Sequence, residues 1–110
     1  MNKKYIISKN LEFQELIKKG KKEKTRFFVI HYKNNNYNYN RYGISVGKKI
    51  GKAVTRNKIK RQIKSILSKN KLNYSKDYVI IVRKEILSIK YFEIKKVLNN
   101  ILKEKIKWKN

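Results

Sequence analysis

The segment DYVIIVR, Asp77–Arg83, constrains the fold of this chain most. Its interior is continuously apolar, which is typical of a strand buried in the middle of a sheet. Two earlier segments, Arg26–Lys33 and Arg41–Gly47, are rich in β-branched and aromatic residues and also predict strands. A further short strand is possible near Lys21–Lys24. The sequence therefore predicts one sheet of three to four strands, and 110 residues suit a single domain, 1–110.

The segment NNNYNYN, residues 34–40, lies between the two earlier strands. Its asparagines favour turns, so we expect a low-complexity, mobile hairpin loop that joins those strands. A base-stacking role for its tyrosines is the alternative. Alternation within the strands predicts one buried sheet face and one partly open face, on which His31 and Lys33 lie.

Three segments have helical periodicity. The first spans about Leu11–Lys19, with Asn10 as its expected N-cap and Gly20 at its end. The second spans about Ala53–Lys69. The third carries an apolar stripe at helical spacing, formed by Ile94, Val97, Leu98, Ile101 and Leu102. This order predicts an α+β fold with two layers, a sheet with helices packed on one side.

The charge of the chain is strongly positive and unevenly distributed. The formal net charge is +24, and no Asp or Glu occurs between Lys24 and Lys76. An AT-rich genome would favour lysine everywhere, but it would not remove glutamate from half of a chain. Such a segment indicates an anionic partner. Nucleic acid is the first candidate, an anionic membrane the second and an acidic protein the third.

The middle helix concentrates this charge on one side. At 100° per residue its isoleucines and Leu67 form an apolar stripe. A continuous polar face lies beside the stripe and consists of Arg56, Asn57, Lys60, Arg61 and Lys64. A merely solvated helix would usually alternate glutamate with lysine, whereas each like-charge i,i+4 pair here costs a few tenths of a kcal/mol. The face therefore predicts binding to phosphates, which Arg holds in a bidentate manner.

The residues that could perform chemistry are sparse. The chain has seven acidic residues, one histidine and no cysteine, so neither a metal cluster nor an acid–base pair is evident. Glu12 and Glu15 are one helical turn apart, and we expect them to cap and solvate the first helix. Neither a signal peptide nor a membrane span is predicted, which favours a cytoplasmic protein with no membrane partner. The polypeptide is expected to bind and position, with no catalytic or metal-binding residues of its own.

The segment SVGKKIGKAVTRNKIKRQIK, Ser45–Lys64, resembles the signature of the bacterial ribonuclease P protein subunit. That signature is a Ser-Val-x-Lys-Lys run followed by Gly-x-Ala-Val-x-Arg-Asn-Arg-x-Lys-Arg, and Lys58 stands where the family usually has arginine. The flanking segments NLEFQELIKKGKK, RFFVIHY and KDYVIIVRK resemble the family's first helix and two of its strands. The resemblance covers about residues 9–102.

The resemblance implies a fold and a function. The fold would be a two-layer sandwich with one mixed sheet and a left-handed β-α-β crossover, ribosomal protein S5 domain 2-like. The chain would be the non-catalytic protein subunit of an RNA-based endoribonuclease that removes the 5′ leader of precursor tRNA. Its partners would be the ribonuclease P catalytic RNA and precursor tRNA. Mg²⁺ would be held mainly by the partner RNA.

The resemblance also assigns two sets of residues. The matching RNA-binding positions are Arg56, Asn57, Lys58, Lys60, Arg61 and Lys64, with Lys48, Lys49 and Lys52 before them. The open sheet face and the first helix would form a cleft for the single-stranded leader, lined by Phe13, Ile17, Val29 and His31. His31 would equally suit a surface position on its strand.

Two alternatives remain open at this stage. A structural ribosomal protein or a general RNA-binding module would have similar size, charge and element order. A nuclease that acts through its own side chains is disfavoured, because the acidic residues are scattered along the sequence.

Overall fold

The computed structural model describes residues 2–70 and 73–105, so the expected basic tail, 107–110, lies outside the described residues. The helices are α1 (Asn10–Lys19), α2 (Ala53–Lys69) and α3 (Tyr91–Asn100), and the strands are β1 (Lys21–Lys24), β2 (Phe28–Asn34), β3 (Arg41–Ser45) and β4 (Lys76–Val82). Short 3-10 segments are η1 (Lys3–Tyr5), η2 (Lys48–Ile50) and η3 (Lys84–Ser88), and a π-helical turn, η4 (Ile101–Lys105), extends α3.

The four strands form one mixed sheet in the order β1-β2-β4-β3. The central place predicted for β4 is confirmed: it pairs antiparallel with β2 and parallel with β3. The expected hairpin between β2 and β3 is wrong, because β4 lies between them. Its uninterrupted apolar sequence explains this position, since a central strand is covered on both faces and paired on both edges.

The loop between β2 and β3 crosses the beginning of β4 and is attached to it. The Asn35 side chain donates hydrogen bonds to Asp77 Oδ1 (2.9 Å) and to the Tyr39 carbonyl oxygen (3.2 Å). The buried Asn40 Oδ1 accepts from the backbone N–H groups of Tyr74 (3.1 Å) and Lys76 (3.0 Å). The asparagines therefore clamp the start of the central strand, and the loop is anchored where a mobile hairpin was expected.

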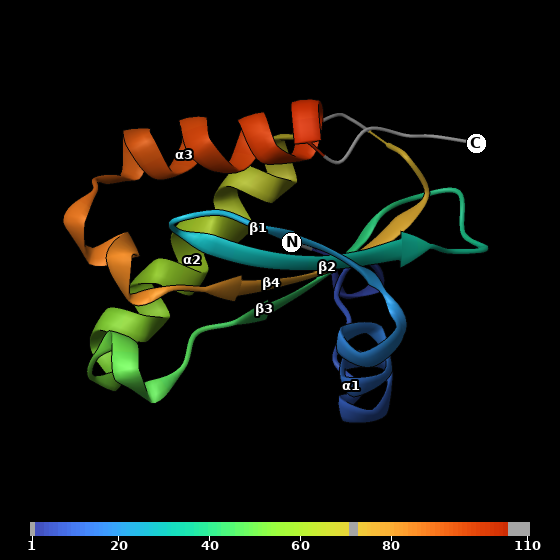
Figure 1. Cartoon of the computed structure of the whole chain (residues 1–110), viewed down its shortest axis with the longest axis horizontal. Helices are drawn as coiled ribbons and strands as arrows, with labels where there is room; N and C mark the ends of the chain where they lie inside the picture. The colour runs from blue at the N-terminus through green and yellow to red at the C-terminus, as the bar shows by residue number, and fades with distance from the viewer. Residues whose placement is uncertain (1, 71–72, 106–110) are drawn as a thin grey trace.

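The two sheet faces are covered by different helices, as Figure 1 shows for α3 and α1. The larger core joins α2 and α3 to the face that carries Phe28, Ile30, Tyr42 and Tyr78. A smaller cluster joins α1 to the other face. The expectation of helices on one side alone therefore holds for α2 and α3 and is wrong for α1. The predicted alternation of buried and partly open residues holds at Phe28, Val29 and Ile30 of β2, but it is wrong at His31, which is buried.

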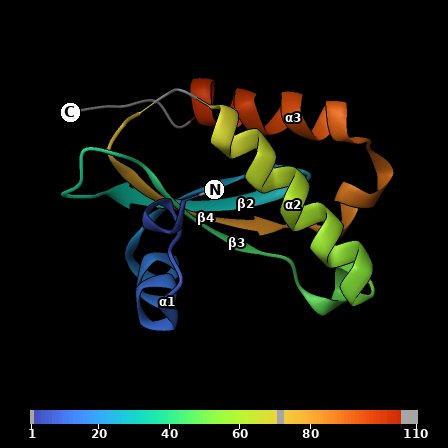
Figure 2. The same ribbon diagram turned by 180° about the vertical axis from the view of Figure 1, so that it is seen from behind.

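The connection β3–α2–β4 joins two adjacent parallel strands and is left-handed. In Figure 2, α2 lies in front of the strands, and β4 runs to the right above β3. The chain leaves the right-hand end of β3, returns through α2 in front of the sheet, and enters the sheet again at β4 above β3. This path is a left-handed crossover, the rare hand for β-α-β units. The hand implied by the resemblance is thus present.

The helix boundaries follow the sequence closely. The middle helix has the bounds that its periodicity predicts, and the stripe of α3 is buried at Ile94 and Leu98. Gly20 ends α1 as expected. Asn10 is the first helical residue and not the cap; the N-cap is Lys9, which makes no side-chain capping bond.

Candidate nucleic-acid interface

The cationic face of α2 is turned to solvent. Its apolar stripe is buried, with Ile63 fully inaccessible. Around the remaining surface, Arg56 and Lys60 are half-buried, while the exposed residues are Asn57, Lys58, Arg61 and Lys64. The ion pairs within the described part of the chain involve none of these cations. The face therefore carries positive charge that the described residues do not neutralise.

The segment that leads into α2 extends this charge. Lys48, Lys49 and Lys52 are all exposed, while Ile50 between them is buried and holds the segment against the core. Gly51 has φ +153°, a backbone conformation that residues with a side chain rarely adopt. The turn at Gly51 thus fixes where the three lysines stand relative to the helix.

The first turn of α2 has features that suit an anion. Its N-cap, Lys52, makes no side-chain capping bond, and the first turn contains no acidic residue. The first N–H groups of a helix point outward and carry partial positive charge. Arg56 Nε is buried and has no hydrogen-bond partner among the described residues. These donors add to the charge of the lysines.

The partly open sheet face is organised in rows that cross all four strands. One row consists of Lys24, Val29, Ile81 and Ser45, which are cross-strand partners. Val29, Ile81 and Ser45 are half-buried and Lys24 is exposed, so this row is accessible from solvent. It combines two aliphatic side chains with a cation at one edge.

The next row lies under α1 and consists of Lys22, His31, Val79 and Gly43. Phe13 rests on Gly43, where a Cβ atom would lie 2.6 Å from the ring. Ile17 packs against the cluster around Leu16 and Val79. The structure therefore brings Phe13, Ile17, Val29 and His31 to the same face of the sheet.

His31 is buried, at 8% exposure, and is not a surface strand residue. Its Nδ1 has no partner among the described residues. Burial lowers the pKa of His31, and the nearby charge of Lys22 lowers it further. The imidazole is therefore neutral at physiological pH and adds no charge to this face.

Arg41 holds α1 on the sheet, a role that the sequence did not indicate. Its Nε and Nη2 donate to the two carboxylate oxygens of Asp77 at 2.9 and 2.6 Å, and Nη2 also donates to Glu12 Oε2 at 2.9 Å. The hydrogen bond to Asp77 raises the pKa of Arg41. Glu12 thus ties α1 to β3, whereas Glu15 makes an exposed pair with Lys19, as expected for a solvated helix.

The two candidate surfaces lie on different sides of the sheet. The cationic helix packs on the face opposite α1 and the row of Val29 and Ile81. The chain passes from one surface to the other after Ser45, where the edge strand β3 ends and η2 leads to α2. Lys48, Lys49 and Lys52 belong to this connection, so they stand between the two surfaces in the chain.

The described residues contain no group of three or more His, Cys, Asp or Glu that could hold a metal ion. None of the helices in this part of the chain has both the length and the apolar composition needed to cross a bilayer.

Comparison with known proteins gives one consistent result. The family model described as Ribonuclease P matches residues 1–106. The ribonuclease P protein component of Mycoplasma capricolum subsp. capricolum is 51% identical over 107 residues, which cover 94% of this chain and 98% of that protein. The RNase P protein of Staphylococcus aureus superposes with a TM-score of 0.84 at 37% identity, covering 96% of this chain and 98% of the other. The RNase P protein of Thermotoga maritima superposes with a TM-score of 0.78 at 35% identity, covering 84% of this chain and 89% of the other.

Proposed function

The chain belongs to the ribonuclease P protein family, and we propose that it is the protein subunit of a ribonuclease P ribonucleoprotein. In this role it binds the catalytic RNA and the 5′ leader of precursor tRNA and assists the endonucleolytic removal of that leader. The work would take place in the cytoplasm. The observation that carries the proposal is the solvent-facing cationic side of α2, which the described residues leave without carboxylate partners.

That face has an energetic cost in the free protein. Arg56–Lys60 and Lys60–Lys64 are like-charge pairs at i,i+4, and each destabilises the helix by about 0.2–0.5 kcal/mol. Phosphates neutralise such a face and release counterions, which favours binding. Contacts of this kind recognise the shape and backbone of a folded RNA more than its base sequence. They suit the catalytic RNA as partner.

The open row suits a single strand of variable sequence. Val29 and Ile81 offer an aliphatic surface, and Lys24 offers a cation at the edge. Apolar contact with the faces of bases is tolerant of sequence, and a cation tracks the backbone. Phe13 and Ile17 on α1 would form one wall of the groove, with Arg41 holding that helix in place. We assign the leader to this groove.

The protein would bind and position while the RNA performs the cleavage. Mg²⁺ would be held mainly by phosphates of the partner RNA, whose oxygen atoms are the kind of ligand that this ion prefers. Neutralisation of phosphates by α2 and its lysines would let the partner RNA hold its metal ions at lower Mg²⁺ concentration.

Reconstitution tests the proposal. Purified protein is added to a bacterial catalytic RNA at low Mg²⁺, and cleavage of a precursor tRNA is followed. We expect strong stimulation by the wild type, and no cleavage by protein without RNA. Absence of stimulation would refute the proposal, and Mg²⁺-dependent cleavage by RNA-free protein would indicate a nuclease acting through its own side chains.

A variant pair identifies the binding surface. Arg56→Ala with Arg61→Ala should weaken affinity for the catalytic RNA and reduce the slope of log affinity against log salt by roughly one to two units. Lys96→Ala with Lys103→Ala removes two exposed charges from the C-terminal helical segment and should change the slope little. Equal slopes for both double variants would show that α2 is the wrong surface.

A structural ribosomal protein or general RNA-binding module is the alternative function. Sequencing of the RNA that co-purifies with the chain separates the two. Enrichment of one catalytic RNA together with precursor tRNA supports the proposal. Recovery of the chain with ribosomal subunits after a high-salt wash supports the alternative.

A further inference from the structure

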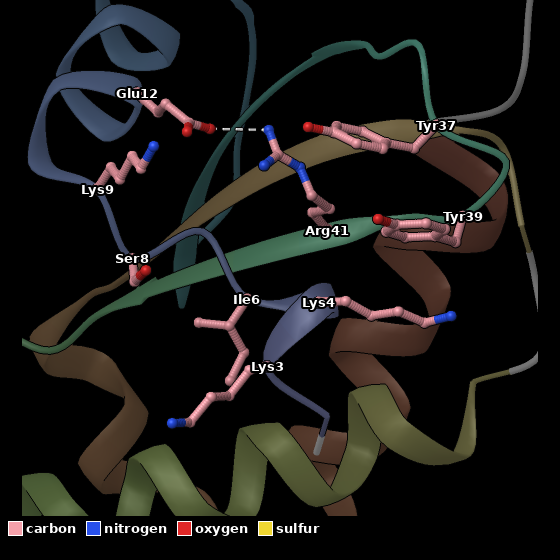
Figure 3. A pocket seen from close by; sticks show the side chains of 9 residues that line it. All are labelled: Lys3, Lys4, Ile6, Ser8, Lys9, Glu12, Tyr37, Tyr39 and Arg41. Carbon is pink, nitrogen blue, oxygen red and sulfur yellow. Dashed lines mark hydrogen bonds and ion pairs between the residues drawn. The ribbon is translucent and has the colours of Figure 1, made fainter.

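A hollow of about 310 Å³ lies apart from both surfaces described above, beside the start of α1. The N-terminal segment, the first turn of α1 and the loop after β2 surround it, as Figure 3 shows. Its polar and aromatic lining comes from Lys3, Lys4, Ser8, Lys9, Tyr37, Tyr39 and Arg41, with Glu12 at the rim. The row of Arg41 and Asp77 is separated from the open row of Val29 by the row that α1 covers. The hollow is therefore distinct from the proposed leader groove.

The charges around the hollow are unbalanced. Four cations face one carboxylate, Glu12, and that carboxylate accepts a hydrogen bond from Arg41 at 2.9 Å. Within the described residues the ion pairs use no amine of Lys3, Lys4 or Lys9. Arg41 is itself committed to Asp77 at 2.6 Å. Three amines thus remain unused by these ion pairs, and Figure 3 shows them on separate sides of the hollow, where each is available to a different phosphate of one strand.

Two aromatic rings form the other side of the hollow. Tyr37 and Tyr39 lie with their ring centroids 5.2 Å apart, tilted by 33°. Lys4 Nζ is 5.0 Å from the centroid of Tyr39, and the Arg41 guanidinium is 4.6 Å from that of Tyr37. Tyr37 is still 45% exposed, so a large aromatic surface stays in contact with water. Exposed aromatic rings beside cations are what single-stranded nucleic acid binds.

The loop that carries these rings is held in place. The Tyr37 backbone N–H donates to Asn35 Oδ1 at 2.9 Å, and the Asn35 amide donates to Asp77 and to the Tyr39 carbonyl oxygen. Tyr5 packs edge-on against Tyr39, with centroids 5.3 Å apart. The rings are therefore presented on a fixed support, which lowers the entropy lost when a ligand binds.

We propose that this hollow binds a short stretch of single-stranded RNA, with one base against Tyr37 and successive phosphates of the strand against Lys3, Lys4 and Lys9. The site rests on the proposed function only in taking RNA as the partner. It is a third contact, separate from α2 and from the leader groove. The strand can come from the precursor leader or from an unpaired stretch of the catalytic RNA.

A fluorescent reporter tests base contact. The chain has one tryptophan, so Trp108→Phe with Tyr37→Trp leaves a single indole at the hollow. Stacking of a base on that indole quenches its fluorescence, whereas phosphate alone does not stack. We expect saturable quenching by hexauridylate and none by polyphosphate. Absence of quenching by hexauridylate, or equal changes with both probes, would overturn the proposal.

Affinity measurements keep the test independent of the tryptophan substitutions. Binding of labelled hexauridylate is measured in the Arg56→Ala, Arg61→Ala background, which weakens the competing surface. Tyr37→Leu should weaken binding about fivefold or more, from the roughly 1 kcal/mol or more of one base stack. The triple variant Lys3→Gln, Lys4→Gln, Lys9→Gln should weaken it further. The matched triple variant Lys18→Gln, Lys96→Gln, Lys103→Gln should bind with nearly unchanged affinity; equal losses in both triples would refute a localised site.

Two additions to the reporter identify the source of the strand. Quenching by the catalytic RNA alone assigns the site to that RNA, and quenching only after precursor tRNA is added assigns it to the leader. Failure of the proposed function would give a different result. The wild-type protein would then not stimulate precursor cleavage, even if hexauridylate quenched the fluorescence of the reporter. Stimulated cleavage without any quenching would overturn this inference and leave the proposed function intact.

Discussion

Arg41 links three parts of the sequence that are far apart. It joins Glu12 of α1 to Asp77 of β4, and the same aspartate accepts from Asn35 of the loop. The Arg41 side chain is 15% exposed and that of Asp77 is 5% exposed, so the pair is largely removed from water. Removal of one partner from such a pair leaves a buried charge without compensation.

Arg41→Ala should therefore destabilise the protein by about 3 kcal/mol, the low end for breaking a buried ion pair. The free energy of unfolding is measured by urea denaturation. The control is Lys19→Ala, which breaks the exposed pair with Glu15. It should change the free energy of unfolding by less than about 0.5 kcal/mol. Similar losses in both variants would mean that the Arg41 network contributes no more than a surface pair.

Gly43 is required by the ring that rests on it. A Cβ atom there would lie 2.6 Å from Phe13 Cε2 and 3.0 Å from Cδ2, so the ring must move. Gly43→Ala should destabilise the protein by about 1–3 kcal/mol through overpacking. Phe13→Leu in the same chain should recover part of this loss, which a double-mutant cycle measures as coupling.

Gly47 provides the matched control for that prediction. Apart from Gly47 and its two chain neighbours, no heavy atom lies within 4 Å of a Cβ atom built there, so Gly47→Ala should change stability by no more than about 0.5 kcal/mol. Strictly additive effects of Gly43→Ala and Phe13→Leu would show that the ring yields without cost.

Sequence reasoning at the scale of single residues succeeded where a periodic pattern was present. The exposure of Arg61 and Lys64 follows from helical spacing. The roles of Arg41, Asn35 and Asn40 do not, because each depends on partners more than 30 positions away. An asparagine-rich run has the same composition whether it is a free loop or a clamp.

The elements themselves were largely predictable, and their pairing was not. The bounds of α2 and β1 agree with the sequence prediction because apolar spacing and flanking turn residues define them locally. The insertion of β4 between β2 and β3 depends on contacts across the whole chain. A short loop between two strands favours a hairpin locally, but burial of the most apolar strand on both edges outweighs that preference.

The cationic side of α2 predicts opposite effects of one substitution on stability and binding. Lys60→Glu converts two repulsive i,i+4 pairs into attractive ones and should stabilise the protein by on the order of 1 kcal/mol. The same change places a negative charge in the proposed phosphate-binding face and should weaken RNA affinity at least tenfold. Thermal or urea denaturation and an RNA-binding titration measure the two effects.

Lys96→Glu on α3 is the control for the loss of net charge. Lys96→Glu should weaken RNA binding much less than Lys60→Glu does, because Lys96 lies outside the proposed phosphate-binding face. Parallel losses of affinity in Lys60→Glu and Lys96→Glu would indicate that net charge alone, and not the position of α2, governs binding.

In the part of the chain that the structure describes, four acidic residues form ion pairs. Glu12 and Asp77 hold Arg41, Glu15 pairs with Lys19, and Glu85 approaches Arg83 at 4.0 Å. The cations of α2 and the three lysines of the hollow are left without such partners among the described residues. The fold therefore neutralises the charges that support it and exposes the charges that face the proposed ligand.

This arrangement predicts that salt acts on folding and on binding with opposite signs. The described part of the chain extends 37 × 28 × 25 Å, and the whole chain has a formal charge of +24. At about 0.01 M salt the Debye length is roughly 30 Å, so cations repel across the whole molecule, whereas at 0.15 M it is roughly 8 Å. Raising NaCl over this range should raise the Tm by a few degrees, because it screens self-repulsion in the compact state.

Affinity for the catalytic RNA should fall steeply over the same range, because each counterion released into more concentrated salt gains less entropy. A calorimetric scan and a binding titration at matched NaCl concentrations measure both trends. Lys60→Glu should show a smaller rise in Tm with salt, since it has already relieved part of the repulsion on α2. A Tm that falls as NaCl rises would mean that favourable ion pairs, such as those of Arg41, outweigh the exposed cations in the electrostatics of folding.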